Sequence, residues 1–133
     1  MNYKKRKIVL LILMLTFCSA SSYAGGKLNP GKYILVSFSM NDQALKDYFI
    51  EAEHHGAVLV FRGLISDGKG GSFALTGKKF ESLGINGDIN PLIFDELAIN
   101  HVPAIVVVRK DGRIKKLSGH VPLLLALQKM GEV

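Results

Sequence analysis

The side chains best suited to covalent chemistry are scarce in this chain of 133 residues. It has a single cysteine, Cys18, which alone forms neither a disulfide-stapled scaffold nor a multi-cysteine zinc module. No serine stands in the G-x-S-x-G arrangement of an α/β hydrolase. Ser39 is better explained as a helix cap, because Asp42 follows it in the S-x-x-D spacing. The residue types therefore give no support to nucleophilic catalysis, and we expect no catalytic residue.

Histidines and one glycine-rich stretch are the remaining candidates for chemistry. His54 and His55 are adjacent and cannot share a helix face, and the single E-x-x-H formed by Glu51 and His54 falls short of the two pairs that di-iron bundles need. Residues 63–69 match G-x-x-x-x-G-K, but Gly70 stands directly after the lysine, where a phosphate loop has Ser or Thr. We expect no metal ion, no cofactor, and a flexible loop at 63–70.

The N-terminal segment predicts export. Residues 4–7 are all basic, residues 8–18 are apolar except for one threonine, and small or polar residues follow up to Ala24. This order is typical of a secretory signal peptide. The apolar run is shorter than the roughly 20 residues that span a bilayer, which argues against a retained signal anchor. We expect cleavage near Ala24, a periplasmic location, and no membrane span in the mature domain.

Cleavage changes both the charge and the thiol content. The whole chain carries 17 Lys+Arg against 11 Asp+Glu, a net +6. Removal of residues 1–24 takes away four basic residues, which leaves +2, and it also removes Cys18, so the exported domain has no thiol chemistry. A charge of +2, without a basic stripe interleaved with aromatic residues, gives no reason to expect a nucleic-acid partner. A basic cluster around a turn at 109–116 fits a solvated hairpin.

The remaining chain predicts a short linker at 25–31 and one α/β domain at 32–133. A helix between the first two strands implies a parallel pair with a right-handed crossover. Asp111-Gly112 predicts a hairpin turn between the last two strands. Further helices are predicted around residues 73–83, from Pro91 and from Pro122. We expect a four-stranded mixed sheet, a parallel pair plus an antiparallel hairpin, flanked by helices; its strands are residues 32–37, 57–61, 104–108 and 113–117.

This order of elements, with Val102-Pro103 just before the hairpin, resembles the thioredoxin fold. The resemblance implies that Pro103 is cis and lies beside the active-site position. Thioredoxin-like enzymes place C-x-x-C after the first strand, where a helix N-terminus lowers the thiol pKa. Residues 38–42 of this chain, Phe-Ser-Met-Asn-Asp, contain no cysteine. The scaffold resembles a redox enzyme, but the thiol chemistry is absent.

Four further segments narrow the resemblance: residues 36–40 (VSFSM), 59–64 (LVFRGL), 89–94 (INPLIF) and 102–104 (VPA). The Arg-Gly-Leu sequence in the second segment is not a generic thioredoxin feature. Together they resemble the TrbC family of type-F conjugative transfer systems, which are periplasmic proteins of pilus assembly. The resemblance implies a role in building the mating pilus, with other pilus-assembly proteins or pilin as partners.

A thioredoxin-like groove without thiols can still bind an extended peptide. The backbone beside Pro103 offers hydrogen bonds in strand geometry, and Phe38 and Met40 offer apolar contact, although both are equally suited to the core. The candidate partner-binding surface comprises Phe38, Ser39, Met40, Arg62, Val102, Pro103 and Ala104.

Arg62 ends an apolar strand, where a solitary cation needs a partner. One interpretation is an ion pair with Asp88 or Asp95 of the same chain. The other is a fixed guanidinium at the binding edge, suited to the carboxylate of a partner protein.

Three classes of function remain open. The first is a non-catalytic periplasmic assembly factor of the conjugative pilus, or type IV secretion system. The second is a generic periplasmic chaperone or peptide-binding module, and the third is a periplasmic oxidoreductase or hydrolase. The family resemblance favours the first, and the lack of cysteine in the mature domain argues against an oxidoreductase.

Overall fold

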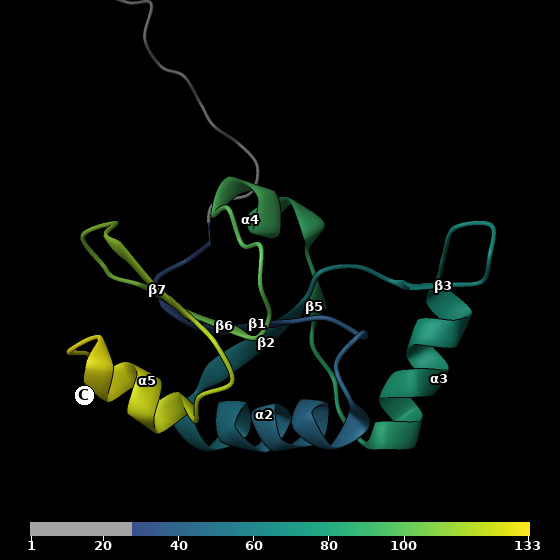
Figure 1. Ribbon diagram of the computed structural model, residues 1–133, viewed down its shortest axis with the longest axis horizontal. Helices are drawn as coiled ribbons and strands as arrows, with labels where there is room; N and C mark the ends of the chain where they lie inside the picture. Colours follow the sequence, from purple (N-terminus) through teal and green to yellow (C-terminus); the bar gives the residue numbers. More distant parts are fainter. Residues whose placement is uncertain (1–27) are drawn as a thin grey trace, which may run out of the picture.

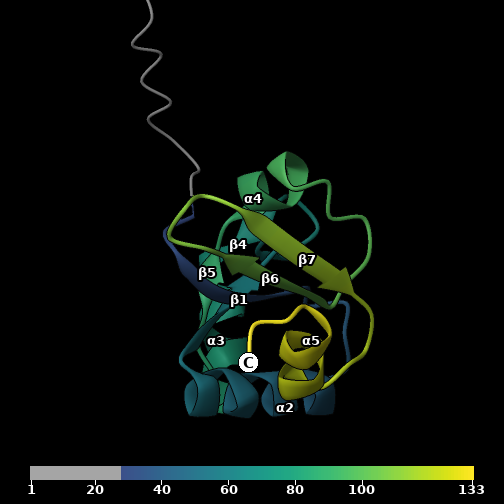
Figure 2. The same ribbon diagram turned by 90° about the vertical axis from the view of Figure 1, so that its left-hand side faces the viewer.

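The computed structural model describes residues 28–133, which form one mixed sheet with helices on both faces (Figure 1). The predicted signal peptide and residues 25–27 of the predicted linker lie outside the described residues. Helices α2, α3 and α5 lie on one side of the sheet and α4 on the other, in both views (Figure 1, Figure 2). The strands are β1 (Gly31–Val36), β2 (Ala57–Phe61), β3 (Ile65–Ser66), β4 (Gly71–Ser72), β5 (Asp88–Ile89), β6 (Ala104–Val108) and β7 (Ile114–Ser118). The helices are α2 (Asp42–His55), α3 (Phe73–Leu83), α4 (Pro91–Glu96) and α5 (Leu123–Lys129).

The main sheet has the strand order β5-β2-β1-β6-β7. Strand β1 is parallel to β2 and antiparallel to β6, and β6 and β7 form the predicted hairpin. The fifth strand, β5, was not predicted: it pairs in parallel with the end of β2, through Val60 with Asp88 and Phe61 with Ile89. A strand of two residues is too short for any hydrophobic periodicity, so its formation depends on the neighbouring strand.

Residues 63–70 also differ from the expectation of a flexible loop. They contribute to a small hairpin, β3–β4, in which Ile65 pairs with Ser72. The side chain of Thr76, which is buried at 3% exposure, accepts a hydrogen bond from the Ile65 amide (3.0 Å) and donates one to the Ser72 carbonyl (2.7 Å). This hydroxyl therefore joins the hairpin to the first turn of α3.

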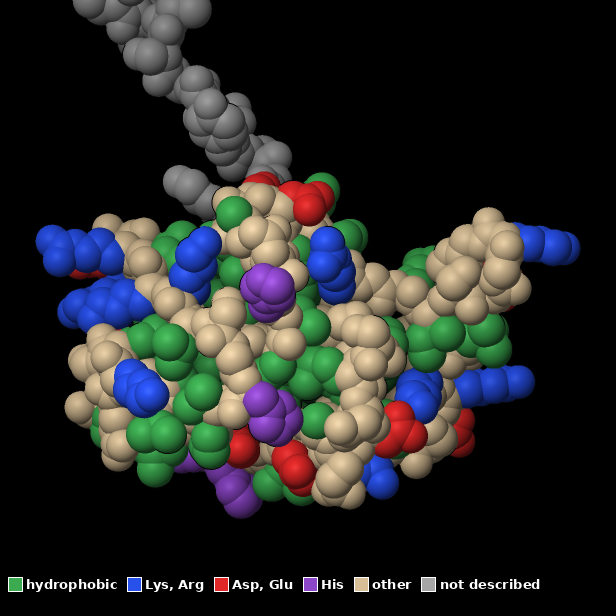
Figure 3. Space-filling model, viewed as in Figure 1, with side chains coloured by type: hydrophobic (Ala, Val, Ile, Leu, Met, Phe, Trp, Pro, Cys, Tyr) green, Lys and Arg blue, Asp and Glu red, His purple; other side chains and the backbone are tan. Residues whose placement is uncertain are grey.

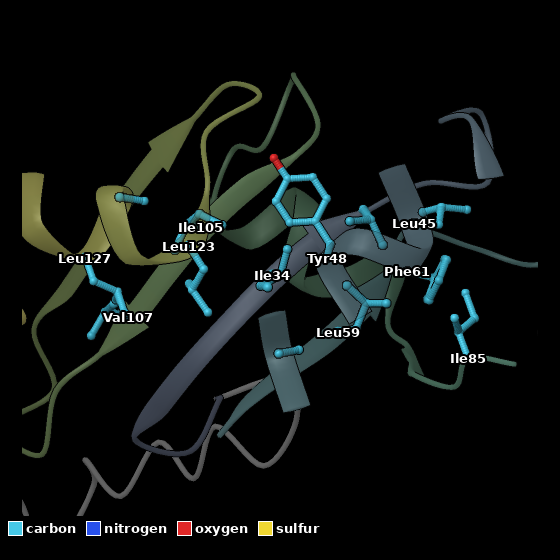
Figure 4. Packing of buried hydrophobic residues seen from close by; sticks show 13 residues of the cluster. Ile34, Leu45, Tyr48, Leu59, Phe61, Ile85, Ile105, Val107, Leu123 and Leu127 are labelled. Atoms are coloured by element: carbon cyan, nitrogen blue, oxygen red, sulfur yellow. The ribbon is translucent and has the colours of Figure 1, made fainter. Parts of the chain in front are cut away.

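The core has two halves, because alternate side chains of a strand point to opposite faces of the sheet. In β1, Ile34 and Val36 enter the half beneath α2 and α5, shown in Figure 4, whereas Tyr33 and Leu35 enter the half beneath α4. All four side chains are buried. The two-sided burial explains the unbroken apolar run that predicted this strand.

The start of α2 corrects a prediction. Asn41, not Ser39, is the N-cap: its side-chain oxygen accepts a hydrogen bond from the Ala44 amide (2.8 Å). Ser39 lies too early, because a turn closes before the helix, with the Met40 amide bonded to the Ser37 carbonyl (3.0 Å). The Asp42 side chain pairs instead with Lys79 Nζ (2.7 Å), which links α2 to α3.

A glycine pair tests the packing between β2 and the segment before β5. A methyl group on Gly87 would lie 2.7 Å from the Leu59 carbonyl oxygen and 2.9 Å from the Phe61 ring, whereas one on Gly77, in α3, would meet no atom within 4 Å. We expect Gly87→Ala to lower the free energy of unfolding by about 1–3 kcal/mol through overpacking. We expect Gly77→Ala to raise it by about 0.5–1 kcal/mol through helix propensity. Urea unfolding measures both, and equal effects would contradict the close contact at Gly87.

Candidate functional site

Three chain segments meet at one end of the sheet, here called the cis-proline edge: residues 37–41, Arg62 and the Val102-Pro103 bond. The register brings them together. Val36, the last residue of β1, pairs with Phe61, and Leu35 pairs with Ala104. The residues just beyond these pairs therefore lie side by side. The structure thus places all seven residues of the predicted surface at or next to one edge.

The Val102-Pro103 peptide bond is cis, as predicted. Pro103 is buried, and its carbonyl accepts a hydrogen bond from the Gly119 amide (2.9 Å). Val102 is half-buried, and its own backbone amide and carbonyl have no hydrogen-bond partner among residues 28–133. Ala104, the first residue of β6, is buried in the core. Of these three residues, Val102 is therefore the one with backbone groups available to another chain.

Phe38 and Met40 both pack against the core and keep part of their surface exposed. The Phe38 ring stacks on Phe61, with 4.3 Å between ring centroids, and is tilted against Phe80 at 5.5 Å. Ser39 is exposed, and its hydroxyl donates to Ser37 Oγ (3.0 Å). The aromatic stack fixes the residues at the position where a thioredoxin-like enzyme carries its cysteines.

Arg62 is exposed, and the predicted ion pair with Asp88 or Asp95 is wrong. Its amide donates to the Val36 carbonyl (3.0 Å), and its guanidinium carbon lies 6.0 Å from the centre of the Phe94 ring. A solvated guanidinium does not need a counterion, and the aromatic face holds it by a cation–π contact. Arg62 is thus a positioned cation without a carboxylate partner in the described part of the chain.

A hollow of about 540 Å³ adjoins this edge and was not predicted. Its apolar lining comes from Phe38, Ile65 and Leu75, and its rim carries Lys78 and Lys79. Apolar side chains gather there, on the right of Figure 3. The hairpin β3–β4 also lies beside this hollow through Ile65. Asp67-Gly68 is a residue pair typical of hairpin turns, and it could have predicted this hairpin where we expected a flexible loop.

The same hairpin explains why residues 63–70 do not serve as a phosphate loop. The amides of Lys69 and Gly70 both donate to Asp67 Oδ1, at 2.8 and 3.1 Å. A phosphate loop offers such amides to its ligand. Here a carboxylate of the same loop occupies them.

A second group of contacts holds the segment after β7 against α2. The Tyr48 hydroxyl donates to the Val121 carbonyl (3.2 Å), and the Leu123 amide donates to the Glu51 carboxylate. Burial, together with the nearby Glu51 charge, raises the pKa of the Tyr48 phenol, which therefore remains a donor. The His120 ring lies edge-on to Tyr48, at 5.6 Å. These contacts position residues 119–123, and through Gly119 they support Pro103.

Among residues 28–133, no cluster of three or more His, Cys, Asp or Glu side chains is arranged to hold a metal ion. Within the same residues, no helix combines the length and apolar character needed to cross a membrane. The chain's only cysteine, Cys18, lies outside them. The cis-proline edge thus offers backbone groups, an arginine and apolar surface to a ligand.

The strand order, the cis-proline before the hairpin and the position of α2 define a protein of the thioredoxin-like class. The fold is similar to that of the pneumococcal exposed lipoprotein thioredoxin Etrx1 from Streptococcus pneumoniae strain TIGR4. The TM-score is 0.54 and the sequence identity 17%, over 77% of this chain and 84% of that one. At this identity the likeness concerns the fold alone.

The chain belongs to the TrbC family, described as type-F conjugative transfer system pilin assembly protein, whose family model matches residues 34–130. This confirms the resemblance drawn from the four sequence segments. Membership implies a role in the assembly of the F-type conjugative pilus. No curated protein matches the sequence.

The exposure of Arg62 leads to a stability prediction. Because its guanidinium forms no ion pair within residues 28–133 and lies over the Phe94 ring, Arg62→Ala should change the free energy of unfolding by less than about 1 kcal/mol. Lys129→Ala, at an exposed position of α5, is the matched control. Urea unfolding followed by circular dichroism measures both variants. A loss of about 3 kcal/mol or more, typical of breaking a buried pair, would contradict the exposed position of Arg62.

Proposed function

We propose that this protein is a non-catalytic assembly factor of the type-F conjugative pilus, or type IV secretion system. It acts in the periplasm and binds an extended segment of pilin or of another pilus-assembly protein at the cis-proline edge. Family membership supports the link to the pilus. The absence of cysteine from residues 38–42, where thioredoxin-like enzymes have their thiols, supports binding over redox catalysis.

The proposal rests mainly on the backbone amide and carbonyl of Val102, which have no hydrogen-bond partner among residues 28–133. An amide and a carbonyl just before strand β6, without partners in the described chain, are the groups that an added peptide strand requires. The cis bond to Pro103 and the hydrogen bond from Gly119 hold this backbone in place. A binding edge that is already ordered loses little conformational entropy when a peptide binds.

Arg62 gives the proposed site a preference for acidic segments. Its guanidinium lies at the same edge and has no carboxylate partner within residues 28–133. A planar guanidinium binds a carboxylate through two parallel hydrogen bonds, which a lysine cannot reproduce. The partially exposed surfaces of Phe38 and Met40 supply apolar contact beside it.

The two alternatives predict different results in simple assays. A periplasmic oxidoreductase would reduce insulin in the presence of dithiothreitol, and we expect the purified protein to show no such activity. A generic chaperone would be dispensable for conjugation. We expect deletion of the gene in a donor strain to abolish pili and mating, and normal piliation in the deletion strain would overturn the proposal.

Substitutions of Arg62 test its role in the site. In the complemented deletion strain, Arg62→Glu should lower mating frequency and pilus number by about tenfold or more, because it replaces attraction to a carboxylate with repulsion. Arg62→Lys should fall between this variant and the wild type, because it keeps the charge but loses the two-point geometry.

Lys129→Glu is the matched control, because it reverses a charge at an exposed position of α5, away from the cis-proline edge. It should leave mating unchanged, and immunoblots should show equal amounts of all variants. Equal mating by Arg62→Glu and the wild type would remove Arg62 from the site.

The proposed location has its own test. If residues 1–24 direct export and are removed, protein released from donor cells by osmotic shock should begin at Gly25. Edman sequencing or intact mass spectrometry measures this. Recovery of the uncleaved chain in the membrane fraction would contradict the predicted signal peptide.

A further inference from the structure

Strand β7 forms an outer edge of the main sheet. It is hydrogen-bonded to β6 on one side and is the last strand in the order β5-β2-β1-β6-β7. Figure 2 shows it at the front of the molecule, and among residues 28–133 no strand pairs with its free side. An edge of this kind presents a row of backbone donors and acceptors to any strand that can align with it.

The hydrogen bonds at the two ends of β7 show which residues face outward. The Arg109 amide bonds to the Arg113 carbonyl (2.8 Å), and the Gly119 amide to the Pro103 carbonyl (2.9 Å). Residues 113 and 119 therefore face β6, and in an antiparallel ladder every second residue between them does so too. The amides and carbonyls of Ile114, Lys116 and Ser118 consequently point away from the sheet.

This edge lacks most of the features that protect exposed strands from pairing. The register with β6 is continuous over five residues, so there is no bulge, and the strand contains no proline. Its two lysines are tied to the flanks of the sheet: Lys116 Nζ donates to the Leu97 carbonyl (2.6 Å) and Lys115 Nζ to the Met130 carbonyl (2.7 Å). Their charges therefore flank the backbone edge above and below.

The surroundings of β7 are strongly basic. Glu132 lies 2.9 Å from Lys115 and 3.6 Å from Arg109, and these neighbours, first of all the Lys115 hydrogen bond, lower the pKa of its carboxyl group. Asp111 lies 3.5 Å from Arg113. In the described part of the chain these two carboxylates face five basic residues, an excess of three positive charges. The Lys and Arg side chains gather on the left of Figure 3. The five basic residues are Arg109, Lys110, Arg113, Lys115 and Lys116.

We propose that the free edge of β7 is a second docking site, which binds an extended acidic segment of a partner protein by strand addition. The backbone groups of β7 would supply the hydrogen bonds, and the excess positive charge selects carboxylate side chains on the incoming strand. A second copy of this chain does not fit, because pairing β7 with β7 brings together two surfaces of like charge. The site is separate from Val102, so evidence against the proposed function at the cis-proline edge would not count against this second site.

Amide hydrogen exchange followed by NMR tests the geometry of the free protein. The amides of Lys115 and Leu117 should exchange slowly because they bond to β6, and those of Ile114, Lys116 and Ser118 should exchange quickly. Protection of all five amides in a monomeric sample would overturn the proposal, because the edge would then already be covered.

A peptide titration tests the occupant. The probe is a short, end-blocked peptide of alternating glutamate and valine, and the control replaces each glutamate with lysine. Only the acidic peptide should shift the β7 amide signals and slow exchange at Lys116, and the effect should weaken with added salt. Shifts confined to Val102 and Arg62, or none, would overturn the proposal.

Three substitutions at Lys116 separate the contribution of the backbone from that of the charge. Lys116→Pro removes an outward amide without removing a bond to β6, and it should weaken binding of the acidic peptide by about tenfold or more. Lys116→Thr keeps the amide and should weaken binding by only about two- to fivefold. Lys116→Glu keeps the amide but lowers the excess positive charge from three to one, so it should weaken binding of the acidic peptide more than Lys116→Thr does. Binding by Lys116→Glu as tight as by the wild type would contradict the role of charge, even if the proline variant fails to fold. Equal binding by the proline and threonine variants would contradict strand addition.

Two controls address other occupants of the basic edge. Sedimentation with phosphatidylglycerol vesicles tests for an anionic membrane surface, and analytical ultracentrifugation tests for pairing of two copies. We expect no vesicle binding and a monomer. Vesicle binding without peptide binding, or a dimer that Lys116→Pro dissociates, would overturn the proposal in favour of those partners.

Discussion

The rest of the structure depends on one constraint at strand β1. This strand is hydrogen-bonded on both edges, and its side chains are buried on both faces. Alternate residues of this strand bond to β2 and to β6, so the directions of both neighbours are fixed by one segment, Gly31–Val36. Its side chains are divided between two halves of the core, which requires helices on both faces of the sheet. Because β1 ends at Val36, residues 37–41, Arg62 and Val102 must meet at one edge. The proposed site is a consequence of strand register, and no single local motif builds it.

The two proposed docking sites both have outward-facing backbone groups, and they differ in chemistry. At the cis-proline edge the groups belong to one residue, Val102, beside an aromatic stack and a single guanidinium. Along β7 they extend over a whole strand, between lysines held against the flanks of the sheet. Both places carry basic side chains, although the domain downstream of residue 24 has a net charge of only +2. The proposed preference for acidic partners therefore rests on the distribution of charge and not on its sum.

Particular residues show why some sequence-based expectations were correct and others wrong. The long strands follow from unbroken apolar runs, and the cis-proline from its place in a recognised order of elements. Asn41, not Ser39, caps α2, because a turn at 37–40 delays the helix. The cation–π contact of Arg62 with Phe94 involves residues 32 positions apart, and sequence spacing gave no reason to prefer it to the pair with Asp88 or Asp95. Likewise β5 exists only because the end of β2 offers it a partner.

By itself, the sequence determined the class of fold, the family and the absence of a thiol from the chain after Cys18, because apolar periodicity, turn residues and residue identity are local properties. Only the tertiary structure decided which polar groups have partners. The free backbone of Val102, the outward amides of β7 and the uncompensated basic residues around it result from contacts between segments far apart in the chain. Hydrogen-bond and ion-pair satisfaction depends on which distant atoms come within about 3–4 Å, and no local pattern encodes that.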